Sequence, residues 1–451
     1  MKLYTILFSI FLTASLPVAA QENILYFLEN TPQSTFSNPA HFTDKSKLVI
    51  GLPVLSGFDI SVNNSFSLRD LGTIENGTLT INFDDFYSKI SQNNYLSENL
   101  TFPLLDFQLR LKNRAFSFGI FENQLVRSGF DRNLIRLVNE GNYPWLESSF
   151  STDIDLKFSH YREYAFGYSQ SVSKKITVGG RIKLLTGFST FNIKRMNIAI
   201  ETGENIEYLK VSTNGEYLTS MPFNLKFGEG ENTGNTSFDA VRYMTNTSNL
   251  GAAIDLGATY NVIPGLEISA SLINLGFIHW KKDAKKLTHN GSFTWEGFDL
   301  SNIQNESGIE EEPYLKPVQS IMDSISGIIN PQSIQNPFNT GIPTKIYIAA
   351  EYQIYNILSA GIVERLLIYD KQVSNALTLS GNLMLGKLFS LSAGYSIIDN
   401  SFNNLSVGTT LKLGPIQFYC LTDNILALNI KNTQNYNIRF GMNLMFGNIK
   451  K

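Results

Sequence analysis

Apolar and polar residues alternate with a period of two over most of this chain, and this alternation constrains the fold more than any other feature. One run places Leu48, Ile50, Leu52 and Val54 on one face, and a longer run covers residues 150–168. A period of two is the pattern of a β-strand whose two faces meet different surroundings. The longer run exceeds a typical globular strand several-fold, which favours a tilted strand in a barrel wall that projects beyond a bilayer.

The alternation recurs at near-constant spacing in the C-terminal third, where every second junction is very tight. Tyr355-Asn356, Gly386-Lys387 and Gly414-Pro415 are short turns, and longer polar segments separate them. Short turns at one end and longer loops at the other are typical of outer-membrane barrels. Counting from turn to turn predicts about fourteen strands, at 46–66, 103–112, 115–126, 150–172, 175–188, 249–262, 266–279, 343–354, 357–369, 374–385, 388–398, 404–413, 416–427 and 435–447.

Strands in a membrane have to form a closed sheet. In hydrocarbon every backbone N–H and C=O must be paired within the protein, so a sheet can enter only when it has no edge. Charged residues make up only 17% of the chain, which also holds 32 Phe and 20 Tyr, as expected when lipid covers one face and aromatic residues gather at both interfaces. We therefore predict an all-β fold, a closed transmembrane antiparallel β-barrel of about fourteen strands in the bacterial outer membrane. A secreted β-sandwich or solenoid would also alternate and is the alternative.

The N-terminus has the pattern of an export signal. Lys2 precedes an apolar run, and small residues at 18–20 come before polar Gln21. We predict a signal peptide at residues 1–20, cleaved after Ala20, because the apolar run is too short and interrupted for a membrane anchor.

The chain end at residues 441–446 alternates and finishes in an aromatic residue. It resembles the insertion signal of bacterial outer-membrane barrels, which the barrel assembly machinery reads. The resemblance implies that Gly441, Leu444 and Phe446 act as the assembly signal, and that this machinery and outer-membrane lipid are partners of the chain.

Several functions are excluded by composition. The net charge of -3 lacks the basic excess of a nucleic-acid binder, and the single cysteine, Cys420, excludes a disulfide framework and a cysteine-rich zinc site. Of the four histidines, His160 follows Ser159 in a strand, so the two side chains point to opposite faces and cannot pair as base and nucleophile. We predict no catalytic residue, no cofactor and no metal, and interpret the acidic run 310–312 as a solvated cluster.

Residues 21–44 read as an irregular arm or plug, because Asn30, Pro32 and Pro39 interrupt any regular pattern. Within it, Asn38, Pro39 and Ala40 resemble an element in the N-terminal plug of FadL-type hydrophobic-compound channels and of the related PorV-type barrels. The resemblance implies a fourteen-stranded barrel plugged by its N-terminal segment, with hydrophobic substrates passing between plug and wall. A simple turn before the first strand is the alternative for Asn38-Pro39.

Three further stretches, at residues 50–56, 161–168 and 275–280, are similar to a family of uncharacterised Bacteroidota outer-membrane proteins. That resemblance implies location and architecture, and it brings no substrate.

The barrel domain, residues 45–451, carries four long insertions on the extracellular side by the turn count. They lie at about 67–102, 127–149, 189–248 and 280–342. Loops of this length usually carry function or disorder. Apolar residues at helical spacing predict short helices at 86–90 and 131–138, and another at 318–329 that caps the barrel mouth or packs within its loop.

Polar residues on the inward faces are the remaining candidates. They pair across the interior or line a wet path. The candidates are Asp106, Arg110, Asp153, Asp155, Arg181 and Glu351. The functional hypothesis is uptake or passage of small hydrophobic molecules, as in FadL-type channels. The alternatives are a PorV-like binding or shuttle protein for secreted or surface partners, and a structural barrel without transport.

Overall fold

The computed structural model describes residues 23–28, 30–41, 46–75, 78–146, 148–203, 208–222, 239–295, 331–370, 372–399, 401–428 and 433–448. The predicted signal peptide, 1–20, and the predicted cap helix, 318–329, lie outside the described residues. Among the described residues, no helix is both long and apolar enough to cross a membrane.

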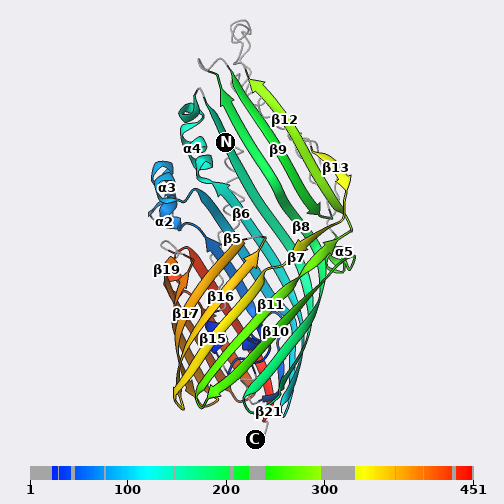
Figure 1. The fold of residues 1–451 in the computed structure, drawn as a ribbon, viewed down its shortest axis with the longest axis vertical. Coiled ribbons are helices and arrows are strands. Elements are labelled where there is room, and N and C mark those ends of the chain that lie inside the picture. Colours follow the sequence, from blue (N-terminus) through cyan, green and yellow to red (C-terminus); the bar gives the residue numbers. More distant parts are fainter. Residues whose placement is uncertain are drawn as a thin grey trace.

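Fourteen antiparallel strand positions form a closed barrel (Figure 1), as the alternation predicted. The sheet closes because β21 pairs with β1 and β2, with Val49 opposite Met445 and Ile60 opposite Ile438. The positions are, in order around the wall, β1 (Ser46–Gly51) with β2 (Phe58–Asn64), β5 (Asn93–Leu111), β6 (Arg114–Asp131), β7 (Ser149–Ser171), β8 (Ile176–Thr202), β10 (Asn249–Ile263), β11 (Leu266–Trp280), β14 (Phe338–Gly341) with β15 (Thr344–Tyr355), β16 (Leu358–Tyr369), β17 (Gln372–Leu385), β18 (Phe389–Ile398), β19 (Ser401–Leu413), β20 (Ile416–Thr422) and β21 (Asn435–Asn448).

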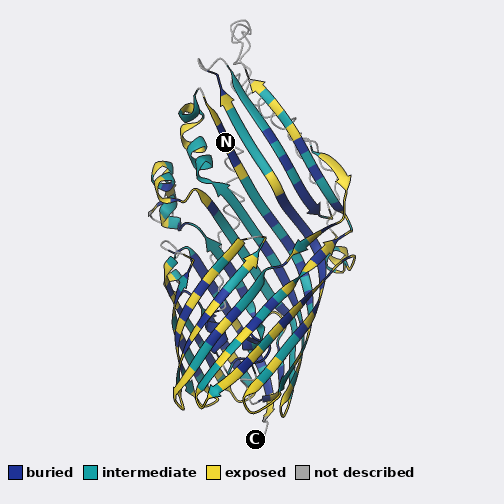
Figure 2. Cartoon of the chain, in the orientation of Figure 1, coloured by how far each residue is buried: buried dark blue, intermediate teal, exposed yellow. Residues whose placement is uncertain are grey.

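Burial alternates along the barrel strands, as the banding in Figure 2 shows. On β8 the outward side chain of Ile182 is 67% exposed, whereas its neighbours Arg181 and Lys183 are 8% and 6% exposed. Ile348 and Leu379 are likewise large, apolar and exposed on the outer surface. An outward apolar belt around a polar interior is the arrangement of a barrel wall in contact with lipid.

The two ends of the barrel differ. Tight turns join the strands at one end, for example between β5 and β6 and between β10 and β11, and we call this the short-turn end. At the other, long-loop end, the upper part of β8 continues beyond the barrel and pairs with β9 (Leu209–Ser220), followed by β12 (Ala284–Trp295) and β13 (Gln332–Gln335). Figure 1 shows these strands rising from the rim as one sheet, which we call the extension.

Small elements cover the rim near β5 and β6. The helices α3 (Phe83–Lys89) and α4 (Arg132–Glu140) lie where apolar spacing predicted short helices. Each is capped by the side chain before it, since Asn82 accepts from Asp85 N–H and Asp131 accepts from Asn133 N–H. The other elements here are α2 (Leu68–Leu71), the β3–β4 hairpin (Gly72–Glu75 and Thr78–Ile81) and η3 (Tyr143–Trp145). Elsewhere, α5 (Ala240–Met244) precedes β10, and η4 (Ile425–Leu428) lies between β20 and β21 in the chain.

Some predicted ranges differ from the structure. The strand predicted at 46–66 is broken into β1 and β2, because Pro53 cannot donate to the ladder and Val54 has a positive φ of 63°. The strand predicted at 416–427 ends at Thr422, where the Asp423 carboxylate accepts backbone N–H groups from residues 23 and 24. The insertions predicted at 189–248 and 280–342 contain the strands of the extension.

Closure can be tested by a crosslink between the first and last strands. In a Cys420→Ser background, Val49→Cys and Met445→Cys should be joined by a short bifunctional thiol reagent, because the two residues are directly opposed and both face inward. Mass spectrometry of the digested protein should recover the linked peptides. The control pair, Val49→Cys with Val363→Cys on β16, should stay unlinked, and equal linkage of both pairs would contradict the strand order.

Candidate functional site

The barrel interior holds an N-terminal segment, residues 23–28 and 30–41, which contains the two short helices η1 (Ile24–Phe27) and η2 (Pro32–Phe36). Its first half is anchored mainly by apolar contacts. Ile24, Leu25 and Leu28 pack against Tyr419 and Leu421 of β20. On the other side, Tyr26 and Phe27 join a buried cluster formed with residues of β11, β15 and β16, which are Ile273, Tyr347, Ala349 and Val363.

Buried polar contacts complete this anchoring. The Asp423 carboxylate accepts Ile24 N–H at 2.8 Å. Gln33 and Asn443 of β21 exchange two side-chain hydrogen bonds, at 2.8 and 3.0 Å, and Gln33 also donates to Asp106 of β5 at 3.1 Å. Since a buried polar group costs free energy unless it is paired, these bonds hold residues 23–33 in place.

The second half of the segment, residues 34–41, is held differently. Three of its backbone carbonyls accept from wall side chains: Thr35 from Arg181 at 2.5 Å, Ser37 from Ser271 at 2.6 Å and Pro39 from Ser169 at 2.5 Å. These bonds come from β8, β11 and β7. Thus residues 34–41 contact the wall through hydrogen bonds that their backbone carbonyls accept.

Asn38, Pro39 and Ala40 form a local turn pressed against two glycines of the wall. The Asn38 side chain accepts Ala40 N–H at 2.9 Å and donates to the Tyr26 hydroxyl at 3.0 Å. A Cβ on Gly179 of β8 would lie 2.3 Å from the Pro39 carbonyl oxygen, and one on Gly257 of β10 would lie 2.1 Å from Asn38 Oδ1. Close approach of the turn therefore requires glycine at both wall positions.

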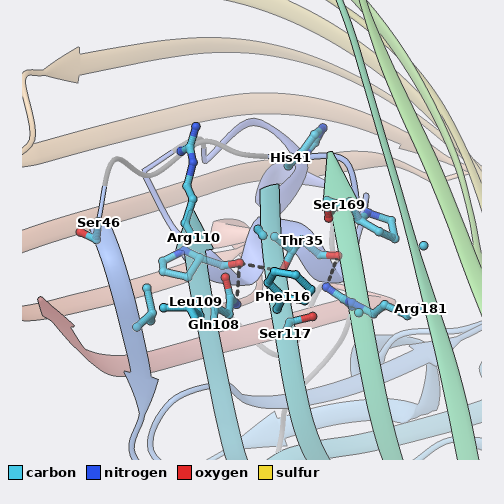
Figure 3. Close-up of a pocket in the computed structure, with 16 residues that line it drawn as sticks. Thr35, His41, Ser46, Gln108, Leu109, Arg110, Phe116, Ser117, Ser169 and Arg181 are labelled. Atoms are coloured by element: carbon cyan, nitrogen blue, oxygen red, sulfur yellow. Dashed lines mark hydrogen bonds between the residues drawn. The ribbon is translucent and has the colours of Figure 1, made fainter. Parts of the chain in front are cut away.

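Two cavities lie on either side of the contact between Arg181 and Thr35. The first, which we call the lower cavity, measures about 50 Å³ and is lined near the short-turn end by Thr35, Pro39, Arg110 and Arg181, among others. Figure 3 shows the hydrogen bond that joins Arg181 to Thr35 in this cavity. The second, which we call the chamber, measures about 80 Å³ and is lined by Phe36, Arg181 and residues of β6, β7 and β11. Arg181 lines both cavities, while Thr35 lines the lower cavity and Phe36 lines the chamber.

A buried charge cluster stands behind Arg181. The Arg181 guanidinium lies 3.7 Å from Asp255 Oδ2 and 5.3 Å from the centre of the Phe36 ring. Lys183 bridges Asp255 at 2.9 Å and Glu163 at 3.1 Å. Phe36 also meets Phe121 edge to face, with ring centres 5.2 Å apart. The boundary between the two cavities thus combines ionic and aromatic contacts.

A third cavity, of about 170 Å³, lies on the other side of the N-terminal segment, and we call it the acidic cavity. Phe27, Glu267 and Glu351 line it together with amides and hydroxyls of β15 to β18. Glu351 accepts from Asn382 at 3.2 Å and from the Ser359 hydroxyl. Glu267 and Glu351 are directly opposed on β11 and β15.

The long-loop end is narrowed by a contact across the mouth. Asp370, between β16 and β17, lies 2.6 Å from Lys157 of β7, which also pairs with Asp155 at 2.8 Å. Next to it, Arg127 of β6 donates to Gln372 of β17. These strands are not neighbours in the wall, so the β16–β17 tip bridges the opening.

The lumen candidates predicted from the sequence lie in several different places. Asp106, Arg110 and Arg181 surround residues 32–35 and the lower cavity, while Glu351 lines the acidic cavity. Asp155 lies at the mouth. Asp153 is exposed and accepts from Asn197, because the register shift between residues 153 and 157 changes the direction of its side chain. Sequence reasoning missed Gly179 and Gly257, although isolated glycines within a strand signal close backbone approach.

The assembly-signal candidates lie on β21. Leu444 and Phe446 alternate with the inward, buried Asn443 and Met445, and Phe446 is exposed. Gly441 lies where an added Cβ would meet the Ser56 backbone at 2.6 Å. Their role in assembly stays a prediction.

Ser159 and His160 have separate partners. The Ser159 hydroxyl contacts Thr190, whereas His160 bonds to Glu122 at 2.9 Å and to the Tyr243 hydroxyl of α5 at 2.7 Å. Glu122 also accepts from Arg162 at 2.8 Å. This network ties α5 to the outside of the wall.

Comparison with protein families gives one match, a model described as a family of unknown function (DUF5723), which covers residues 39–423. No curated protein sequence matches the chain significantly.

Solved structures with a similar shape include hydrocarbon channels. A deletion mutant of the TodX monoaromatic hydrocarbon channel matches at 10% identity and a TM-score of 0.42, over 91% of this chain and 92% of that one. The CymD monoaromatic hydrocarbon channel matches at 12% and 0.40, over 92% of each chain, and a Pseudomonas aeruginosa FadL homologue at 11% and 0.35, over 92% and 91%. These likenesses are distant, and the closed barrel is established by this chain's own strand pairings.

The glycine contact gives a direct test of how residues 34–41 are held. Gly179→Val should displace Pro39, because backbone atoms occupy the space that the new side chain needs, and overpacking of this kind costs about 1–3 kcal/mol. Limited proteolysis should cut residues 34–45 faster, and the unfolding midpoint should fall. Gly381→Val is the matched control, since nothing lies within 4 Å of a Cβ there. Equal resistance of both variants would show that the turn does not press on this wall.

Proposed function

This chain belongs to the DUF5723 family, and we propose that it is an outer-membrane channel through which small hydrophobic molecules pass between the N-terminal segment and the barrel wall. The exposed apolar belt and the closed ladder support a position within lipid. In that position the short-turn end faces the periplasm and the extension lies outside the cell.

The route runs along the barrel axis. Each described strand position hydrogen-bonds to both of its neighbours, and the β10–β11 pair is interrupted only by register shifts. The ladder is interrupted between β1 and β2, where Val54 N–H still donates to the Pro103 carbonyl and Met442 N–H donates to that of Leu55, so backbone hydrogen bonds bridge the break. A molecule that enters at the mouth meets the chamber and then the Arg181–Thr35 contact.

The observation that carries the proposal is that Arg181 lines two cavities, with its bond to Thr35 and its contact with the Phe36 ring at their boundary. Residues 23–28 are fixed by buried clusters. Residues 34–41 accept three side-chain bonds through their carbonyls, and their other contacts include the Asn38 bond to Tyr26 and the Phe36 contact with Phe121. Moving the second half alone joins the chamber to the lower cavity without unfolding the first half. We call residues 34–41 the gate.

The lining suits molecules with an apolar body. Phe36, Phe121, Tyr161 and Ile273 line the chamber, and Pro32 and Pro39 line the lower cavity. Aromatic faces and edges offer large contact area to a planar ring. Small ring compounds thus fit the proposed route better than sugars or peptides do.

A second candidate function is the binding of secreted or surface proteins, which apolar side chains exposed at the long-loop end favour. Val241 and Ile334 are 74% and 62% exposed, beyond the part of the wall that lipid would cover. If partners dock there, crosslinking on intact cells should capture a partner with the native chain and lose it with Val241→Ser and Ile334→Ser. Unchanged capture by the double variant would count against this surface.

A disulfide lock tests the gate. In a Cys420→Ser background, Ser37→Cys and Ser271→Cys should form a disulfide, since both positions already carry a Cβ and the Ser271 hydroxyl lies 2.6 Å from the Ser37 carbonyl oxygen. Oxidised cells should take up the uncharged aromatic dye N-phenylnaphthylamine more slowly, because the gate can no longer leave the wall. A reducing agent should restore uptake.

The controls for the lock are the two single variants and cells without the protein. Dye uptake that is equal in the oxidised and reduced double variant, with disulfide formation verified by mass spectrometry, would contradict passage past the gate.

A further inference from the structure

We infer that the molecules admitted at the gate carry a negative charge beside their apolar body, so that the route selects small aromatic carboxylates. The inference rests on the proposed function for the route itself, and it concerns the chemistry of the residues that line that route.

Most of the charged residues that line the chamber are cations. Its charged lining residues are Arg181, Lys183, Lys345 and Arg439 on the positive side and Glu163 on the negative side. The carboxylates that pair with two of these cations are withdrawn from the lining. Asp59, which pairs with Arg439 at 2.9 Å, and Asp255, which pairs with Lys183, are 1% and 0% exposed and do not line the chamber. The surface that a ligand meets is therefore basic.

The lower cavity continues this basic lining toward the short-turn end. Arg181 and Arg110 both line it, and among the described residues that line it none is Asp or Glu. Arg181 and Arg110 come from β8 and β5, on two sides of the same cavity. A molecule that moves from the chamber to the periplasmic side thus passes from one cation to the next.

Acidic residues gather on the opposite side of the N-terminal segment. The acidic cavity presents Glu267 and Glu351, and no Lys or Arg is found among its described lining residues. The segment therefore separates the chamber and the lower cavity, whose charged lining is mainly basic, from a cavity whose charged lining is acidic. A narrow space lined by one sign of charge concentrates ions of the other sign.

A carboxylate has a specific place to bind. Arg181 donates a hydrogen bond to a neutral acceptor, the carbonyl of Thr35, through one amino group, while the other lies 3.7 Å from Asp255 Oδ2. Its guanidinium is 5.3 Å from the Phe36 ring centre. A charged acceptor makes a bond roughly twice as strong, and a carboxylate can accept two parallel bonds from one guanidinium. An arriving carboxylate thus replaces Thr35 on Arg181, and this exchange releases the gate. The Phe36 and Phe121 rings lie where the apolar part of the same molecule would rest.

Equilibrium binding to the purified full-length mature protein in detergent tests this inference. The ligands are benzoate, benzyl alcohol and benzylamine, which share one ring and differ in charge, and isothermal titration measures their affinities. Benzoate should bind most tightly and benzylamine least. Arg181→Gln should weaken benzoate by at least about tenfold, because it removes a hydrogen bond to a charged group.

Glu351→Gln is the matched control, since it neutralises a charge on the acidic side and should leave benzoate affinity unchanged. Arg110 lines the lower cavity and not the chamber. If Arg181→Gln does not fold, Arg110→Gln should still lower the affinity for benzoate, by a smaller factor. Equal affinity for the three ligands, tighter binding of benzylamine, or equal loss in the Arg181 and Glu351 variants would overturn the inference. Because this experiment measures affinity in detergent and not uptake, its failure would overturn the charge selectivity alone. Whether molecules pass the gate is decided separately by the disulfide lock.

Discussion

The need to pair every backbone polar group within hydrocarbon is the constraint on which the rest of this structure depends. A flat sheet would expose an edge to lipid, and closing β21 onto β1 and β2 removes it. Closure divides the side chains into two rows. The outward row is apolar and exposed, as Ile182 and Phe166 are, and the inward row is left to carry charge and hydrogen bonds without contact with lipid.

The closed ring also determines what can happen inside it. Fourteen strand positions enclose a space wide enough for a folded segment, and residues 23–28 and 30–41 lie within it. The first half of that segment is fixed by apolar clusters and paired amides, while the second half lies on glycines and accepts bonds through its carbonyls. The same segment separates a basic lining from an acidic one, so a single element supplies a gate and a division of charge. The mouth contact between Lys157 and Asp370 adds a second narrowing at the other end.

Much of the wall was predictable because a period of two is a local property. The turns at 112–113, 264–265 and 386–387 and the C-terminal strands lie where the alternation and turn residues placed them. The extension was not predicted, since the length of an insertion says nothing about which distant strands it pairs with. The alternation along their strands correctly predicted that Arg181 and Asp106 point inward. Asp153 does not, because a register shift lies between it and Lys157, and no pattern in the sequence predicts that shift. The need for glycine at positions 179 and 257 could not be predicted, because the turn that presses on them, at Asn38 and Pro39, is more than a hundred residues away in the chain.

The claim that alternate side chains of the closed wall face lipid is tested most directly along β7. Spin labels placed singly at residues 163 to 168, in the Cys420→Ser chain reconstituted in bilayers, report the accessibility of each side chain to dissolved oxygen, which concentrates in lipid. The account predicts high accessibility at positions 164, 166 and 168 and low accessibility at the odd positions between them, which face the lumen. Uniform accessibility along the run, or greater access of a water-soluble relaxing agent at the even positions, would contradict it.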